Sequence, residues 1–277
     1  MKTQKQENFP VASLLFKKKI RKIITDYYNF ARYCDDIADN PKYTTKQKLK
    51  DLEFVEQSLF GISEQKYGKM LREDFLSEKL DFSLATDLLI AFRQDAEKTT
   101  YQTWSQLLDY CKYSAVPVGR FMLAIHDENP STYLPASALC IVLQLVNHIQ
   151  DLKNDIKDLK RIYIPEELLV KYKVSKRALT AAKCSKNLHF LLNDVLDRCC
   201  GLLKDAEILP TIIKNMRLKI YICITLSLSK ILINKLYNHD ILEKKVCLTK
   251  TDWLLAMIKG ICKGLFIKRK TLANEGL

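Results

Sequence analysis

The sequence predicts an all-α protein, and three observations support that class. Glycine is scarce, with 7 residues in 277 against a usual share of about 7%, and this disfavours sandwiches, propellers and barrels, which need glycine at many turns. Leu, Ile, Lys, Ala, Asp and Glu dominate the composition, and together they favour helices. Apolar residues recur at helical steps along most of the chain. Because no linker or composition shift divides it, residues 1–277 are expected to form one domain.

The expected helices follow one another with short connections. The first covers residues 11–39 and ends before Pro41, because proline disfavours helical geometry in the residue that precedes it. Residues 104–125 are expected to form a kinked helix, since Pro117 removes a helical hydrogen bond and Gly119 loosens the next turn. The other expected helices cover residues 44–59, 80–94, 134–157, 175–203, 210–236 and 251–264.

The chain is strongly basic, with a formal net charge of +13. This charge suits a polyanionic partner, meaning nucleic acid, an acidic membrane surface or a phosphorylated ligand, although a solvated basic surface explains it equally well. No nucleic acid partner is expected, because no recognisable binding motif accompanies the charge. Basic residues cluster at residues 17–22 and 268–270, and we expect both clusters to bind an anionic membrane surface.

Cysteine usage and apolar runs indicate the compartment. The nine cysteines are odd in number and show no C-x-x-C spacing, which is typical of free, buried thiols in a reducing cytoplasm. No signal-peptide pattern and no uninterrupted run of 18 apolar residues occurs. A cytoplasmic protein, at most peripheral on the inner membrane, is therefore expected. The chain also lacks G-x-G-x-x-G and G-x-x-x-x-G-K-[ST], so neither common nucleotide-binding fold has support.

A first cluster of acidic residues lies near the end of the first expected helix. Asp35 and Asp39 are one helical turn apart on the same face, with Asp36 beside them. Like charges at this spacing repel by roughly 0.2–0.5 kcal/mol, and aspartate is unfavourable at the negative end of the helix dipole. Such carboxylates need a cation, and all-oxygen ligands suit Mg²⁺, which binds through carboxylates together with substrate phosphates.

A second cluster repeats this arrangement on a later apolar helix. Asn147, Asp151 and Asp155 follow one another at one-turn spacing, and Gln144 extends the stripe. Such a stripe either is solvated or lines a polar cavity, and two stripes on otherwise apolar helices favour the cavity. If the two stripes face each other, their carboxylates would bind several metal ions and, through them, a diphosphate. His148 is expected to face away from the stripe and to serve in packing.

Four blocks of the sequence resemble the squalene and phytoene synthases, which join isoprenyl diphosphates head to head. They are similar to the family's first aspartate-rich motif, its kinked helix with a cavity tyrosine, its second aspartate-rich motif and its closing Arg-x-Tyr-x-Pro block. The blocks are residues 28–39, 110–120, 144–155 and 161–165, within a likeness that covers about residues 7–265. The resemblance implies an isoprenoid synthase helical bundle with a central apolar cavity. It also implies Mg²⁺ held by Asp35, Asp36, Asp39, Asp151 and Asp155.

Further details resemble one branch of the family, the bacterial hydroxysqualene synthases of the hopanoid pathway. Residues 7–13 and 250–254 are similar to that branch, and Gln150 stands where most relatives carry arginine. Members of this branch ionise presqualene diphosphate and capture the carbocation with water, giving hydroxysqualene and diphosphate. The resemblance therefore implies that Mg²⁺ is needed and that NADPH is not.

The surrounding side chains receive roles from this chemistry. Arg32 is expected to contact the diphosphate, and the ring faces of Tyr28, Tyr110 and Tyr113 would steady a cation. The residues expected to aim the water are Gln144, Asn147 and Gln150, and those expected to bind substrate besides Arg32 and Tyr113 are Arg120, Arg161 and Tyr163.

Two other interpretations of the resemblance stay open. A condensing member of the family, namely a presqualene diphosphate, squalene or phytoene synthase, would consume farnesyl diphosphate supplied alone. A non-enzymatic assembly factor with this fold would carry degraded aspartate motifs, whereas both motifs are intact here.

Overall fold

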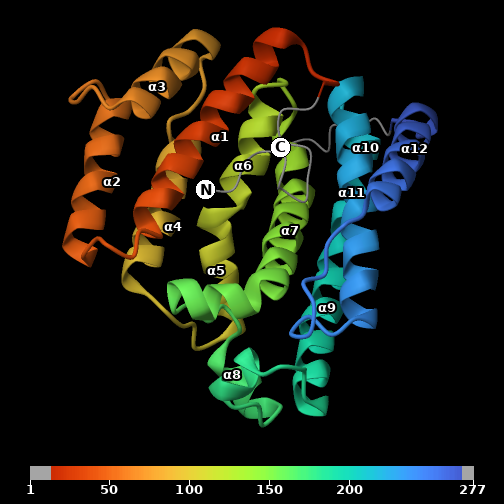
Figure 1. Cartoon of the computed structure of the whole chain (residues 1–277). Helices are drawn as coiled ribbons and strands as arrows, with labels where there is room; N and C mark the ends of the chain where they lie inside the picture. The colour runs from red at the N-terminus through yellow and green to blue at the C-terminus, as the bar shows by residue number, and fades with distance from the viewer. Residues whose placement is uncertain (1–13, 270–277) are drawn as a thin grey trace, which may run out of the picture.

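The computed structural model describes residues 14–269, which fold into helices joined by short loops (Figure 1). The described residues contain no β-strand, and Thr100 and Ile162 form an isolated bridge between two loops. The expected all-α class is therefore confirmed. In chain order the α-helices are α1 (Lys18–Ala38), α2 (Thr45–Leu59), α3 (Lys66–Glu78), α4 (Ser83–Glu97), α5 (Trp104–Ser114), α6 (Val116–Ala124), α7 (Tyr133–Asn154), α8 (Glu166–Lys171), α9 (Lys186–Ala206), α10 (Leu209–Ile212), α11 (Met216–Asn238) and α12 (Lys250–Phe266).

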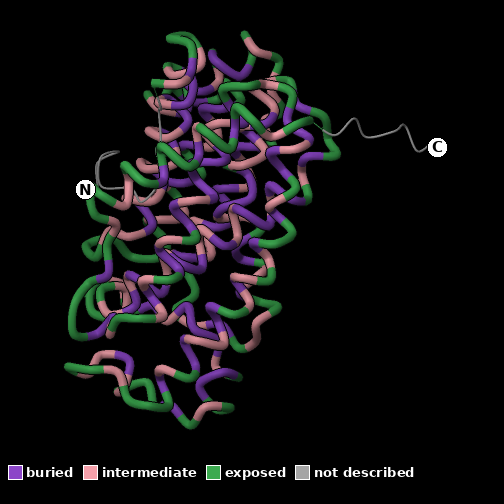
Figure 2. Tube along the Cα trace, turned by 90° about the vertical axis from the view of Figure 1, so that its right-hand side faces the viewer, coloured by how far each residue is buried: buried purple, intermediate pink, exposed green. Residues whose placement is uncertain are grey.

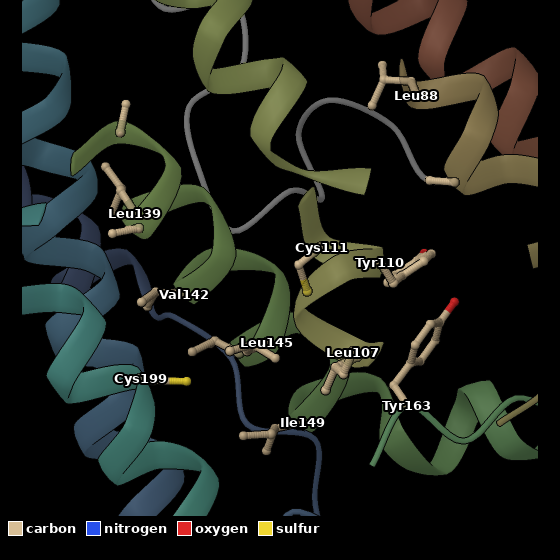
Figure 3. Close-up of a cluster of buried hydrophobic side chains, with 14 of the residues drawn as sticks. Leu88, Leu107, Tyr110, Cys111, Leu139, Val142, Leu145, Ile149, Tyr163 and Cys199 are labelled. Atoms are coloured by element: carbon tan, nitrogen blue, oxygen red, sulfur yellow. The ribbon is translucent and has the colours of Figure 1, made fainter. Parts of the chain in front are cut away.

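Figure 1 shows the helices in three groups, with α1–α4 on one side, α5–α7 in the middle and α9–α12 on the other side. The central helix is α7, which contacts α5, α6, α9 and α11. Its buried face carries Leu139, Val142, Leu145 and Ile149, which lie in the apolar cluster drawn in Figure 3 together with Cys199 of α9. Buried segments run through the middle of the molecule and exposed segments form its rim (Figure 2).

The segment Pro130–Leu159, which contains α7, is the one helix among the described residues that is long and apolar enough to cross a membrane. Half of its most apolar window (50%) is buried inside the bundle, and the helix bears Asp151 and Asp155. These features are those of a core helix, because polar side chains on one face and apolar contacts on the others suit the interior of a bundle around a polar site.

The predicted kink in residues 104–125 is confirmed as a break between α5 and α6. The break falls at Ala115, whose backbone leaves the helical region (φ −127°, ψ −40°). Pro117 lies in the first turn of α6, where its missing N–H costs no helical hydrogen bond. Gly119 allows α6 to approach α7, since a Cβ at this position would lie 2.5 Å from the Sγ of Cys140.

Several predicted helix boundaries are wrong. Helices α3 and α8 were not predicted at all, and α1 begins at Lys18, after a turn. Residues 175–185 are not α-helical, because α9 begins after Ser185, whose hydroxyl accepts a hydrogen bond from the N–H of Leu188 and caps the helix. Residues 1–13, with the expected opening block, and Lys270 of the second basic cluster lie outside the described residues.

The helix expected over residues 210–236 is divided into α10 and α11. The carboxylate of Glu128, from the loop after α6, accepts hydrogen bonds from the backbone N–H groups of Lys214 and Asn215. The side chain of Asn215 in turn caps α11. A contact from a distant part of the chain therefore sets this break.

All nine cysteines are free thiols, as their spacing predicts. Cys34, Cys111, Cys199 and Cys223 are buried, in agreement with the prediction, whereas two others, in the segment before α12 and on α12, are exposed.

Candidate active site

A cavity of about 470 Å³ opens between α1, α4, α5 and α7. Both acidic stripes line it, with Asp35 and Asp39 from α1 and Asp151 and Asp155 from α7. The structure therefore brings together the two clusters that sequence periodicity predicts to lie on separate helices. Asp36 does not line the cavity, because it is rotated by about 100° from Asp35 around the helix.

Basic side chains hold the carboxylates of the first stripe. Arg32 lines the cavity and donates hydrogen bonds to Asp35 at 2.6 Å and to Asp36 at 2.5 Å. Asp39 accepts a hydrogen bond from Arg161 at 2.7 Å. Burial, and next the negative charge of Asp39, raise the pKa of the Asp35 carboxyl above its ordinary value. A cation beside these carboxylates would relieve that cost.

The second stripe also lines the cavity, from α7 and the turn that follows it. Gln144, Asn147, Asp151 and Asp155 all contribute to the lining, as the one-turn spacing predicts. Asp151 forms an ion pair with Lys245, from the segment between α11 and α12. The sequence gives little signal for Lys245, because its place beside the stripe depends on how that segment packs against α7.

Asp95, on α4, forms hydrogen bonds with several of the predicted site residues, although it was not predicted to belong to the site. Its carboxylate is buried and accepts hydrogen bonds from the hydroxyls of Tyr110 at 2.9 Å and Tyr163 at 3.0 Å. Figure 3 shows these two tyrosines side by side. Arg161 donates its Nε–H to the backbone carbonyl of Asp95 while its terminal nitrogen holds Asp39. Burial raises the pKa of Asp95 to about 6. Asp95 therefore helps to hold Arg161, which in turn holds Asp39 of the first stripe.

The expectation that His148 faces away from the stripe is wrong. His148 lines the cavity, and its ring stacks on Tyr163 with centroids 3.6 Å apart. A helix has 3.6 residues per turn, so a residue four after Gln144 and three before Asp151 must lie on their face. Burial lowers the pKa of His148 to about 3, which keeps the imidazole neutral at pH 7.

Three predicted residues lie away from the cavity. Gln150 is buried, and its amide donates a hydrogen bond to the carbonyl of Val246 at 2.7 Å; it is one residue before Asp151 and so faces another direction. Arg120 approaches the ring of Tyr133 at 5.9 Å. Neither these two nor Tyr113 lines the cavity. The structure therefore places Gln150, expected to aim the water, outside the cavity lining.

The lining of the cavity combines polar and apolar side chains. Tyr28, Ala31, Phe92 and Leu159 contribute apolar surface beside the carboxylates. Behind the stacked rings of His148 and Tyr163 lies a small apolar crevice of about 10 Å³, lined by Leu107, Leu145, Ile149 and Val195 among others. Apolar side chains therefore line part of this cavity beside the carboxylates.

The donor set around the cavity fits a hard divalent cation and a polyphosphate. Carboxylates from two facing helices supply only oxygen ligands, which Mg²⁺ prefers. Arg32 and Lys245 stand among these carboxylates, and such side chains make charge-assisted hydrogen bonds to phosphate oxygens. A bundle of helices with two opposed aspartate stripes around one cavity defines the isoprenoid synthase class.

Comparison with known proteins agrees with this class. The squalene/phytoene synthase family matches residues 2–252, so the chain belongs to the squalene/phytoene synthase family. Hydroxysqualene synthase of Rhodopseudomonas palustris is 36% identical over 92% of this chain and 88% of its own length. Hydroxysqualene synthase of Zymomonas mobilis is 35% identical over 91% of this chain and 86% of its own.

Solved structures show the same fold. Squalene synthase HpnC from Alicyclobacillus acidocaldarius superposes with a TM-score of 0.72 at 26% identity, over 81% of this chain and 85% of that one. A dehydrosqualene synthase superposes with a TM-score of 0.75 at 20% identity, over 91% of this chain and 90% of that one.

Proposed function

We propose that this protein is a hydroxysqualene synthase, which ionises presqualene diphosphate with the help of Mg²⁺ and captures the carbocation with water. The observation that carries the proposal is the convergence of two acidic stripes on one cavity, in a chain whose relatives at 35–36% identity are hydroxysqualene synthases. In this reaction the carbon–oxygen bond of the diphosphate ester breaks, its electron pair leaves with diphosphate, and a water oxygen bonds to the carbon and loses a proton. No hydride is transferred, so no NADPH is needed.

The residues proposed to hold Mg²⁺ are Asp35, Asp39, Asp151 and Asp155. When bound, the metal would supply positive charge to the leaving diphosphate. Arg32 lies beside this set and is proposed to bind diphosphate oxygens directly. Asp36 pairs with Arg32 outside the cavity lining, and we assign it to orienting that guanidinium.

Arg161 and Tyr163 are proposed to position other groups, although sequence resemblance implies that they bind substrate. The Arg161 side chain is 6% exposed, and its guanidinium donates to the carbonyls of Asp95 and Ala38 and to the carboxylate of Asp39. Those bonds use three of the five N–H donors of the guanidinium, and they hold Asp39 toward the cavity, which Arg161 also lines. The hydroxyl of Tyr163 is likewise directed at Asp95.

We propose that aromatic side chains stabilise the carbocation and that side-chain amides orient the water that captures it. Tyr28, Phe92 and Tyr110 line the cavity, and aromatic faces attract cations. Gln144 and Asn147 also line it, and their amides are proposed to orient the attacking water. Gln150 lies outside the cavity lining, with its amide bonded to the carbonyl of Val246, and we propose no such role for it.

The test supplies presqualene diphosphate and Mg²⁺ without NADPH in ¹⁸O-labelled water. We expect diphosphate release and a C30 alcohol that carries the label, while farnesyl diphosphate supplied alone stays unconsumed. Condensation of farnesyl diphosphate would instead identify a condensing member of the family, the second candidate, which the weaker similarity to 15-cis-phytoene synthase of Enterobacter agglomerans (27% identity) supports. Absence of turnover with either substrate would favour a non-enzymatic role.

A further inference from the structure

Helix α12 (Lys250–Phe266) lies at the edge of the molecule and packs on α11 through a seam of small residues (Figure 1). Ala256, Gly260 and Gly264 form this seam at one-turn spacing, and all three are buried. A Cβ on Gly260 would lie 2.5 Å from the side chain of Ile224, and one on Gly264 would lie 2.8 Å from that of Ile220. The two helices are therefore in close contact, and the seam fixes which face of α12 points outward.

The outward face of α12 is apolar. Leu254, Leu255, Ile258, Leu265 and Phe266 have exposed fractions of 59%, 51%, 53%, 53% and 81%. These positions lie opposite the small-residue seam on a helical projection. Large apolar side chains gathered on one exposed face mark an interaction site, whereas single exposed apolar residues need no explanation. We call these five residues the α12 apolar face.

Exposed basic residues border the α12 apolar face. Lys259 and Lys263 lie along one side of it, and Lys268 and Arg269 follow its last turn. The acidic residue of the helix, Asp252, is engaged in the capping box at its start and in an ion pair with Lys235. Basic residues therefore border the α12 apolar face along one side and beyond its last turn.

The basic cluster at the start of α1 lies at the same end of the molecule. The carbonyl of Leu15 accepts a hydrogen bond from Arg217, at the start of α11, and Leu15 packs in the small apolar cluster that also holds Ile220. Ile220 is the contact of Gly264. The exposed residues Lys17, Lys18 and Lys19, and the 85%-exposed Leu14, consequently lie near the end of α12.

We propose that the α12 apolar face, with the basic residues around it, docks the protein onto an anionic lipid bilayer. An apolar helix face flanked by lysines is the arrangement that lies in the plane of a bilayer, with the apolar side chains among the acyl chains and the lysines among the phosphates. A second copy of this chain is a poorer occupant, because its own lysines would face these lysines. The proposal does not rest on the proposed reaction.

The test is flotation with vesicles of phosphatidylcholine, with or without phosphatidylglycerol, in the absence of substrate. We expect the wild type to bind the vesicles that contain phosphatidylglycerol, and to be released by high salt because exposed charges are screened. The double variant Ile258→Ser/Phe266→Ser should bind at least about tenfold more weakly, since each substitution removes apolar burial from the bound state. Lys259→Gln/Lys263→Gln should weaken binding at low salt and flatten the salt dependence.

The matched control is Phe54→Ser/Leu76→Ser, which removes two exposed apolar residues from α2 and α3 on the other side of the molecule. It should bind vesicles like the wild type, and far-UV circular dichroism should show all variants folded. Equal binding by the α12 variant and the wild type, or binding that ignores phosphatidylglycerol, would overturn the proposal. A second result would also overturn it. The wild type would fail to bind vesicles and would sediment as a dimer, and Ile258→Ser/Phe266→Ser would convert that dimer to a monomer.

Discussion

His148 offers a quantitative test of the cavity wall. Its pKa is lowered from 6.5 to about 3 by burial against Tyr163, so the folded protein keeps a neutral imidazole at a pH where the unfolded chain binds a proton. Stability should therefore be full above pH 6.5 and be lost as the pH falls toward 3. Between pH 7 and pH 5, linkage with an unfolded pKa of about 6.5 gives a loss of about 2 kcal/mol from this residue.

The perturbation is His148→Phe, which keeps a ring to stack on Tyr163 and cannot take a proton. We expect urea unfolding, followed in EDTA at pH 7 and pH 5, to show the free energy of unfolding falling by about 2 kcal/mol more in the wild type than in the variant. Other titrating groups affect both proteins and cancel in the difference. The same pH dependence in His148→Phe and the wild type would show that the folded protein does not keep this imidazole neutral.

Substitutions of residues that line the cavity, and of Gln150, which does not line it, should have different effects. Asp35→Asn or Asp151→Asn should lower turnover by at least about 10²–10³-fold while the melting temperature stays nearly unchanged, because each carboxylate acts on charge that develops during ionisation; near wild-type turnover would exclude that residue from the metal site. Asn147→Leu should reduce the share of alcohol among the products. Gln150→Arg should lower the free energy of unfolding by about 1–3 kcal/mol, because the bond to the carbonyl of Val246 is lost, and it should leave the product ratio unchanged. Product analysis and urea unfolding separate these outcomes, and a changed product ratio in Gln150→Arg would contradict the position of that side chain.

The acidic stripes could be predicted from the sequence because they obey a local rule. Residues four apart on a helix share a face, and so Asp35 with Asp39 and Asp151 with Asp155 follow from the helix alone. The same rule places His148 on the stripe and Gln150 off it, and the structure has both side chains there.

The residues that hold the stripes in place could not be predicted in this way. Asp95 lies in the last turn of α4, and its partners Tyr110, Tyr163 and Arg161 follow 15, 68 and 66 residues later. Such contacts depend on how helices pack, which no local pattern specifies. The break before α11 has the same origin, since the carboxylate of Glu128 reaches it from a distant loop.

The ion pairs of the cavity predict that metal and diphosphate bind together. Arg32 holds Asp35, and Lys245 holds Asp151. Mg²⁺ alone would have to displace Arg32 from Asp35 and Lys245 from Asp151, which would leave Arg32 with Asp36 alone and Lys245 without this counter-charge. Diphosphate alone would face the carboxylates. With both present, the carboxylates turn to the metal and Arg32 and Lys245 turn to the phosphates, so every charge keeps a partner. A ligand that binds only the folded state at 100 times its dissociation constant stabilises it by about 2.7 kcal/mol, so inorganic diphosphate with Mg²⁺ should raise the melting temperature by several degrees while either alone raises it little. A full shift with Mg²⁺ alone would show that Arg32 and Lys245 do not exchange partners in this way.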